Sequence, residues 1–180
     1  MSKSPLHIYV DGSSGRTGED LATSDTPAGW GFCVVEGDSG LGRGGGEVVD
    51  ERSGPVVTDP SQPDYLGAEV GSNNTAELTA IAHAARWVLS HPEGDGVVIR
   101  GDSQYALTIA SGEWRAKANQ DLAASVKALW KEADSIRGLR AEHVRAHRGH
   151  RWNERADHLA FRAMQGETPL PLQFWKPGKR

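Results

Sequence analysis

Four acidic residues of this 180-residue chain stand where folding could gather them into one cation site. Asp11 follows the apolar residues 8–10, and Asp102 comes shortly after the apolar residues 97–99. Open α/β sheets bind ligands at the carboxyl ends of their strands, so these two carboxylates are predicted to share one edge of a sheet. The other two acids lie early in predicted helices, and the full set is Asp11, Glu77, Asp102 and Asp157.

Carboxylates that meet in this way raise one another's pKa, so four of them could not all stay ionised without a cation. Hard divalent ions such as Mg²⁺ favour carboxylate oxygens, and two such ions about 3.5–4 Å apart clamp a phosphodiester for in-line displacement. Each acid also has an ordinary structural explanation: a turn residue, a capping-box glutamate, a helix N-cap and a solvent-facing helix charge, respectively. Taken one at a time, the acids leave both interpretations open.

Hydrophobic periodicity predicts the elements that would position these acids. The first long helix is expected to begin with a capping box formed by Asn74 and Glu77. The order of elements starts with antiparallel strands and then alternates strands with helices, which predicts an α/β fold with a mixed five-stranded sheet flanked by helices. Strands are predicted at 8–10, 28–36, 65–70, 97–99 and 139–144, with short β-type pieces at 48–49 and 56–57 and no strand pairing predicted within 37–64. Helices are predicted at 74–90, 102–110, 120–136 and 152–164.

Composition indicates one soluble globular domain, with 37% hydrophobic residues and a net charge of −4. The single cysteine, Cys33, excludes a disulfide framework and suits a reducing compartment, so a cytoplasmic monomer without a membrane segment is expected. Residues 137–180 hold ten Lys and Arg against four Asp and Glu, which could form a local basic surface despite the acidic total. Residues 1–166 are predicted to form the catalytic domain, and residues 167–180 a Pro-rich basic tail.

Four blocks of sequence carry a resemblance to one family. They are Tyr-Val-Asp-Gly-Ser-Ser, Asn-Asn-Thr-Ala-Glu-Leu, Gly-Asp-Ser-Gln-Tyr and His-Arg-Gly-His-Arg-Trp-Asn-Glu-Arg-Ala-Asp. In order and in element type, they resemble the signature blocks of the type 1 ribonuclease H family. The resemblance implies a ribonuclease H-like fold and an endonuclease that cuts the RNA strand of RNA–DNA hybrids. It also implies two Mg²⁺ ions, or Mn²⁺, and products with 5′-phosphate and 3′-hydroxyl ends.

The resemblance also implies a role for individual residues. The four acids would be the metal ligands, with Asp11 bridging both ions, and His147 matches a mobile-loop histidine that assists proton transfer or product departure. Asn73, Asn74 and Gln104 would contact the RNA strand, although helix capping is an alternative for the asparagines. Ser72 would hold a DNA phosphate, and the Gly12–Ser14 backbone would lie nearby. The complete set of implied nucleic-acid contacts is Gly12, Ser13, Ser14, Ser72, Asn73, Asn74 and Gln104.

The chain departs from the family pattern in three places. Thr75 stands where many members have an arginine, and the loops at 15–27 and 37–64 are longer than usual. Residues 112–119 lead almost directly into the next helix, so the Trp- and Lys-rich protrusion that grips the duplex in many members is missing. The basic residues of 137–180 are expected to compensate in part.

Three other interpretations were weighed. Resolvases and proofreading exonucleases of the same fold share clustered acids but not the spacings found here. A catalytically silent hybrid-binding module would not need all four acids. A zinc site formed by His143, His147 and His150 would need a further ligand, and the only thiol, Cys33, is distant in sequence.

Overall fold

A computed structural model describes residues 5–15, 21–40, 44–145 and 150–180. Its strands are β1 (Leu6–Ser14), β2 (Ala28–Glu36), β3 (Glu47–Pro55), β4 (Val97–Gly101) and β5 (Leu139–His143). They form one five-stranded sheet in the order β3-β2-β1-β4-β5. The pairs β1–β2 and β2–β3 are antiparallel, whereas β1–β4 and β4–β5 are parallel. The predicted mixed sheet is confirmed.

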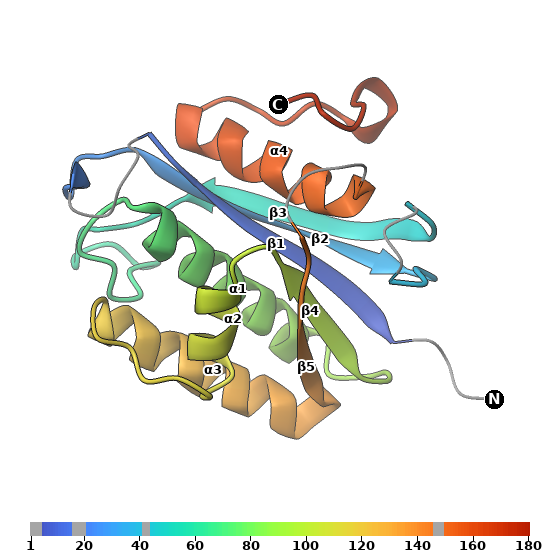
Figure 1. Ribbon diagram of the computed structural model, residues 1–180, viewed down its shortest axis with the longest axis horizontal. Coiled ribbons are helices and arrows are strands. Elements are labelled where there is room, and N and C mark those ends of the chain that lie inside the picture. Colours follow the sequence, from blue (N-terminus) through green and yellow to red (C-terminus); the bar gives the residue numbers. More distant parts are fainter. Residues whose placement is uncertain (1–4, 16–20, 41–43, 146–149) are drawn as a thin grey trace.

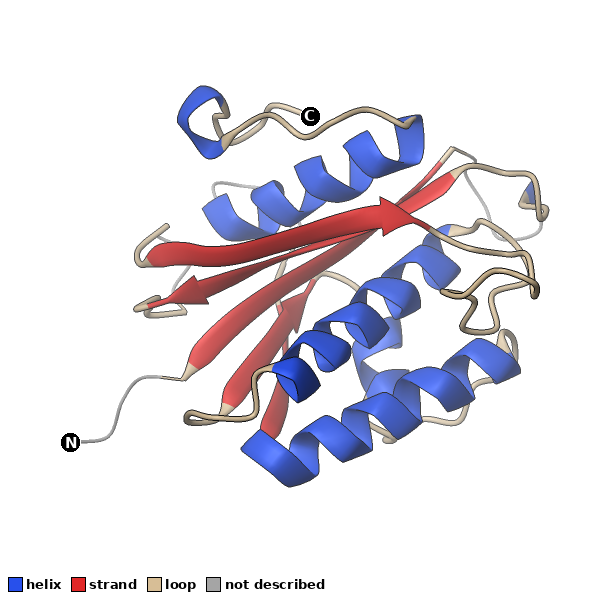
Figure 2. Cartoon of the chain, turned by 180° about the vertical axis from the view of Figure 1, so that it is seen from behind, coloured by secondary structure: helices blue, strands red, loops and turns tan. Residues whose placement is uncertain are grey.

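The helices cover both faces of the sheet. On one face lie α1 (Asn73–Ser90), α2 (Gln104–Ala110) and α3 (Gln120–Arg137), and on the other lies α4 (Arg151–Gln165) (Figures 1 and 2). Ile8 and Val10 of β1 belong to the large apolar cluster shared with α1, whereas Tyr9 belongs to a smaller cluster shared with α4. Residues 8–10 of β1 are all apolar because helices pack on both faces of the strand.

One predicted strand and two predicted β-type pieces differ from the structure. Residues 65–70 are not a strand: Gly67 has a φ of +115°, and a Cβ there would lie 2.7 Å from the backbone nitrogen of Leu122 in α3. This segment is apolar because it packs beside α3, not because it joins the sheet. The two short pieces predicted at 48–49 and 56–57 are replaced by the single strand β3, whose Pro55 is tolerated because β3 is an edge strand.

The cap of α1 also differs from the prediction. Ser72, not Asn74, is the N-cap, and its hydroxyl accepts a hydrogen bond from the backbone N–H of Thr75 at 3.1 Å. The Thr75 hydroxyl in turn accepts from the backbone N–H of Ser72 at 2.9 Å, so these two residues form the capping box. Glu77 is consequently not needed at the helix start. Likewise Ser103, rather than Asp102, is the N-cap of α2.

The connection between α2 and α3 is short. Residues 111–119, all of them described, form turns and contain no helix, which agrees with the predicted absence of the family's protrusion. Residues 167–180 do not extend away from the molecule but return along α4 through the 3-10 turn η2 (Leu172–Phe174) (Figure 1). Within the described part of the chain, none of the helices has the length and apolar character needed to span a bilayer.

Candidate metal centre

Two of the predicted carboxylates lie on neighbouring parallel strands. Val10 of β1 pairs with Gly101 of β4. The next residues of the two strands, Asp11 and Asp102, are therefore neighbours at the carboxyl edge of the sheet. Asp11 is 4% exposed in the centre of the sheet, and the backbone N–H of Gly12 donates to its Oδ1 at 2.8 Å. The parallel pairing of β1 with β4 therefore brings together the two acids that the sequence placed at the carboxyl ends of strands.

Glu77 reaches the same place because α1 lies directly against β1 at Gly12. A Cβ on Gly12 would lie 2.5 Å from the backbone carbon of Ala76 and 2.5 Å from the backbone nitrogen of Glu77. The absence of a side chain at Gly12 thus sets the distance between the strand and the helix. Glu77 is 8% exposed and turns its carboxylate toward Asp11.

Replacing Gly12 by Ala is expected to lower the free energy of unfolding by roughly 1–3 kcal/mol or more, because backbone atoms of α1 must move to admit the methyl group. The same shift should displace Glu77 and weaken Mn²⁺ binding. Urea unfolding and calorimetric Mn²⁺ titration measure the two effects. Gly45→Ala is the control, since a Cβ at Gly45 meets nothing within 4 Å. Equal stability and metal affinity in the two variants would contradict this account of Gly12.

One oxygen from each of Asp11, Glu77 and Asp102 lies within 4.8 Å of the others. Burial raises the pKa of Asp11 well above its usual range, and the charges of Glu77 and Asp102 raise it further. Burial likewise raises the pKa of Glu77 to about 8. These pKa shifts express the cost of gathering buried carboxylates without a positive charge. A divalent cation would remove that cost, and an all-oxygen set of ligands suits Mg²⁺ or Mn²⁺.

The fourth acid, Asp157 of α4, is not part of this three-oxygen group but lines a cavity beside it. The cavity has a volume of about 190 Å³ and is also lined by Asp11 and Asp102. Both carboxylate oxygens of Asp157 accept hydrogen bonds from Arg180, each at 3.0 Å. The structure thus places all four predicted acids at one site and adds an arginine that the sequence did not indicate.

A model of the RNase H family matches residues 3–165. This chain belongs to the RNase H family. The ribonuclease H of Dinoroseobacter shibae is 31% identical to it, over 97% of this chain and 95% of that protein. RNase H1 from the halophilic archaeon Halobacterium salinarum shares the fold with a TM-score of 0.62 and 25% identity, over 91% of this chain and 99% of that one. LC11-RNase H1, solved in complex with an RNA/DNA hybrid, has the same fold at 20% identity, with a TM-score of 0.61 over 89% of this chain and 97% of that one.

The residues expected to contact nucleic acid in this RNase H differ in how accessible their side chains are. Asn73 and Gln104 are exposed at the starts of α1 and α2. Ser72, by contrast, is 1% exposed and its hydroxyl takes part in the capping box. The hydroxyl of Ser13 donates to the sulfur of Met164 at 3.6 Å, and that of Ser14 donates to the carbonyl of Gly71 at 2.7 Å. Asn74 is half-buried, and it has interactions of its own within the protein.

The histidines give no support to the zinc interpretation. His147 lies outside the described residues. Nε2 of His143 lies 3.1 Å from the carbonyl oxygen of Asp102, and the ring of His150 packs at 5.3 Å from that of Tyr9. Among the described residues, the acidic group that could hold a metal ion includes no histidine.

Sequence reasoning missed three residues that line the cavity of the acids: Asn153, Glu154 and Arg180. Asn153 is 3% exposed, and neither its Oδ1 nor Oε2 of Glu154 has a hydrogen-bond partner among the residues that the structure describes. Asn153 and Glu154 stand three and four positions before Asp157 in the fourth signature block, so their helical spacing could have placed them there. Nothing in the spacing between Asp157 and Arg180 indicates their contact.

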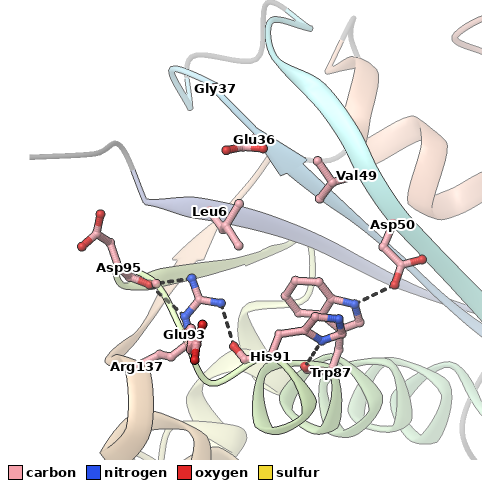
Figure 3. A pocket seen from close by; sticks show the side chains of 11 residues that line it. Leu6, Glu36, Gly37, Val49, Asp50, Trp87, His91, Glu93, Asp95 and Arg137 are labelled. Atoms are coloured by element: carbon pink, nitrogen blue, oxygen red, sulfur yellow. Dashed lines mark hydrogen bonds between the residues drawn. The ribbon is translucent and has the colours of Figure 1, made fainter.

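A second cavity, of about 740 Å³, lies near the start of β1 and is open beside the end of α1 (Figure 3). Its polar groups are engaged with one another: Nε1 of Trp87 donates to Asp50 at 2.7 Å, and the Arg137 guanidinium donates to the carbonyls of His91 and Asp95. The Trp87 ring is stacked on that of His91 at 4.0 Å, and its residue is 5% exposed. Within the described part of the chain, the acids that line this cavity do not form a second group close enough to hold a metal ion, so it is not a competing metal centre.

Proposed function

We propose that this protein is an endonuclease that hydrolyses the RNA strand of RNA–DNA hybrids with two divalent cations, leaving 5′-phosphate and 3′-hydroxyl ends. The observation that carries the proposal is the group of three carboxylates within 4.8 Å, two of them buried and that of Asp102 half-buried, with Asp157 lining the same cavity as Asp11 and Asp102. Burying ionisable acids such as Asp11 and Glu77 lowers the stability of the metal-free protein, and a module that only binds hybrids would have no need of them. Membership of the RNase H family gives the substrate class.

The four acids would hold the ions, which are Mg²⁺ in this proposal, with Mn²⁺ able to substitute. Bound there, the ions would supply the Lewis acid that activates the attacking water and stabilises the leaving 3′-oxygen. Asp11, on the central strand and within 4.8 Å of both Glu77 and Asp102, would be the acid that contacts both ions. The carboxylates also repel the phosphates of nucleic acid, so productive binding of substrate depends on their neutralisation.

Discrimination of RNA from DNA is assigned to the surface at the starts of α1 and α2, beside the carboxyl edge of the sheet. A hybrid is distinguished by the 2′-hydroxyls of its RNA strand, which both donate and accept hydrogen bonds. Asn73 and Gln104 have side-chain amides with the same dual capacity and are exposed on that edge. The proposed interface also includes Ser72, Asn74 and the backbone of Gly12–Ser14. Because the Ser72 hydroxyl is buried, Ser72 would contact the nucleic acid through its backbone or after its hydroxyl shifts. A fold relative bound to an RNA/DNA hybrid supports this class of partner.

A cleavage assay tests the proposal with one labelled sequence prepared as RNA–DNA hybrid, double-stranded RNA and double-stranded DNA, with Mg²⁺ or with EDTA. We expect Mg²⁺-dependent internal cuts in the RNA strand of the hybrid alone, with 3′-hydroxyl ends that a polymerase can extend. Cleavage of duplex or branched DNA would favour a resolvase, and shortening from one end would favour an exonuclease. Hybrid binding without any cleavage would identify a silent binding module.

His147 is proposed to assist proton transfer or product departure without holding a metal. General acid–base help contributes typically 10²–10⁴-fold, so His147→Ala should slow turnover by about that factor and retain Mg²⁺-dependent cleavage. Single-turnover and steady-state rates separate the chemical step from product release. Calorimetric Mn²⁺ titration is the decisive companion measurement, because a loss of metal affinity in His147→Ala would make this residue a ligand.

We also propose that the enzyme works as a monomer in the cytoplasm. Cys33 is buried and unpaired, as expected of a protein that resides in a reducing compartment. Sedimentation of the purified protein with and without hybrid tests the oligomeric state.

A further inference from the structure

The last six residues of the sequence, 175–180, form a segment that we call the arm, and two ring systems fix its position. Trp175 is 3% exposed, and its Nε1 donates to the carbonyl of Lys179 at 2.8 Å. Nδ1 of His158, a fully buried residue of α4, lies 3.1 Å from the same carbonyl oxygen. Nε2 of His158 accepts from the backbone N–H of Leu170 at 3.0 Å, so Nδ1 is the nitrogen that carries the proton. The carbonyl of Lys179 is thereby held by two donors.

This anchoring brings the next residue, Arg180, onto α4. Its Nε and Nη2 donate to the two carboxylate oxygens of Asp157, each at 3.0 Å, and its guanidinium carbon lies 4.6 Å from the centre of the Phe161 ring. Asp157 and Phe161 are one helical turn apart, so the guanidinium is held by the carboxylate and the ring on a single face of α4. Bidentate pairing with a stacked arginine is a specific geometry rather than a loose surface contact.

The arm also forms part of the wall of the candidate metal centre. Gly178, Lys179 and Arg180 line the same cavity as Asp11 and Asp102. The Arg180 charge is therefore placed beside the carboxylates that line this cavity. Its Asp157 partner is one of the four acids proposed to hold the ions.

We propose that Arg180 competes with a divalent cation for Asp157, so that the arm sets the metal concentration at which the site fills. The inference rests on the proposed two-metal function. In the metal-free protein the guanidinium neutralises Asp157. When ions occupy the site, like-charge repulsion and the loss of free oxygens on Asp157 release the Arg180 side chain, which leaves that side of the cavity while the arm stays anchored.

Competition, rather than stable sharing of Asp157, follows from the charges. The fork of Arg180 occupies both oxygens of Asp157, and an ion bound by those oxygens would place its double positive charge within a few ångströms of the guanidinium. The ion pair is also weak enough to exchange, because its side chains are 55% and 29% exposed. The Trp175 anchor keeps Arg180 at a high effective concentration near Asp157, so the competition does not need a strong pair.

Calorimetric Mn²⁺ titration without nucleic acid tests the proposal on the full-length protein. Arg180→Ala should bind Mn²⁺ about three- to tenfold more tightly than the unmodified protein at the weaker site, the range expected for loss of an exposed but bidentate ion pair. Arg180→Lys, which keeps the charge but loses the fork, should lie between them. Lys176→Ala removes the same charge from the same exposed arm and is the matched control. Trp175→Ala, checked for folding by circular dichroism, should release the arm and reproduce the Arg180→Ala affinity.

A second readout follows the arginine directly. The Nε–H resonance of Arg180, identified by its loss in Arg180→Lys, should move toward the position of solvent-exposed arginines as Mg²⁺ is added. If the unmodified protein binds Mn²⁺ but Arg180→Ala binds it equally or more weakly, the competition is overturned and the metal function stands. If neither protein binds Mn²⁺, and Asp11→Asn behaves as they do, the metal function and the inference both fall.

Discussion

Replacing Asp102 by Asn is expected to reduce the rate of hybrid cleavage by more than about 10³-fold, beyond the 10²–10³-fold attributed to one well-placed electrostatic group. The substitution removes a charge and almost no volume, and Asp102 is only partly buried. The fold and the affinity for hybrid should therefore persist while the metal centre loses one of its three clustered oxygens. Single-turnover cleavage in Mg²⁺ measures the rate, and fluorescence anisotropy in Ca²⁺ or EDTA measures hybrid binding.

Glu93→Gln is the matched control for that experiment, because Glu93 is exposed and lines the other cavity, near the start of β1. It should cleave at the unmodified rate. A rate for Asp102→Asn within tenfold of the control would refute the assignment of Asp102 as a metal ligand. Cleavage restored by a higher Mn²⁺ concentration would instead support it, since Mn²⁺ accepts a neutral amide oxygen more readily than Mg²⁺ does.

Features encoded by neighbouring residues could be predicted from the sequence. The apolar residues 8–10 of β1 lead directly to Asp11, Asp102 follows the end of β4, and the parallel pairing of these strands places both acids at one edge. The helical stripe of α1 carries Glu77 toward the same edge. These predictions held because burial and periodicity are local properties of the chain.

Features that depend on tertiary contacts could not be predicted in this way. Residues 65–70 have the composition of a strand, but their apolar side chains are buried against α3, and composition records burial without recording the partner. Asn and Ser are both favourable N-cap residues, so composition does not choose between Asn74 and Ser72. In the structure, the reciprocal hydrogen bonds between Ser72 and Thr75 make Ser72 the N-cap. The contact of Arg180 with Asp157 requires the chain to turn back along α4.

The buried carboxylates also have an effect on stability, and its sign can be worked out. Burial raises the pKa of Asp11 above its usual range and that of Glu77 to about 8, whereas both have ordinary values near 4 in the unfolded chain. Between those values the folded protein holds more protons than the unfolded chain, so the free energy of unfolding falls as pH rises. The metal-free protein should therefore lose stability progressively from about pH 4 to pH 8.

Asp11→Asn is accordingly expected to abolish cleavage and yet stabilise the metal-free protein, by roughly 1–3 kcal/mol at pH 8, because it removes the charge that costs most to bury. The difference should vanish near pH 4, where the acids are protonated in both proteins. Urea unfolding in EDTA across this pH range measures it. Saturating Mg²⁺ should reverse the order at pH 8, since an ion present at about 1,000 times its Kd stabilises the binding-competent protein by about 4.1 kcal/mol and leaves the variant unchanged. A variant that is less stable than the unmodified protein at pH 8 in EDTA would show that Asp11 is paired in the fold rather than held for a metal.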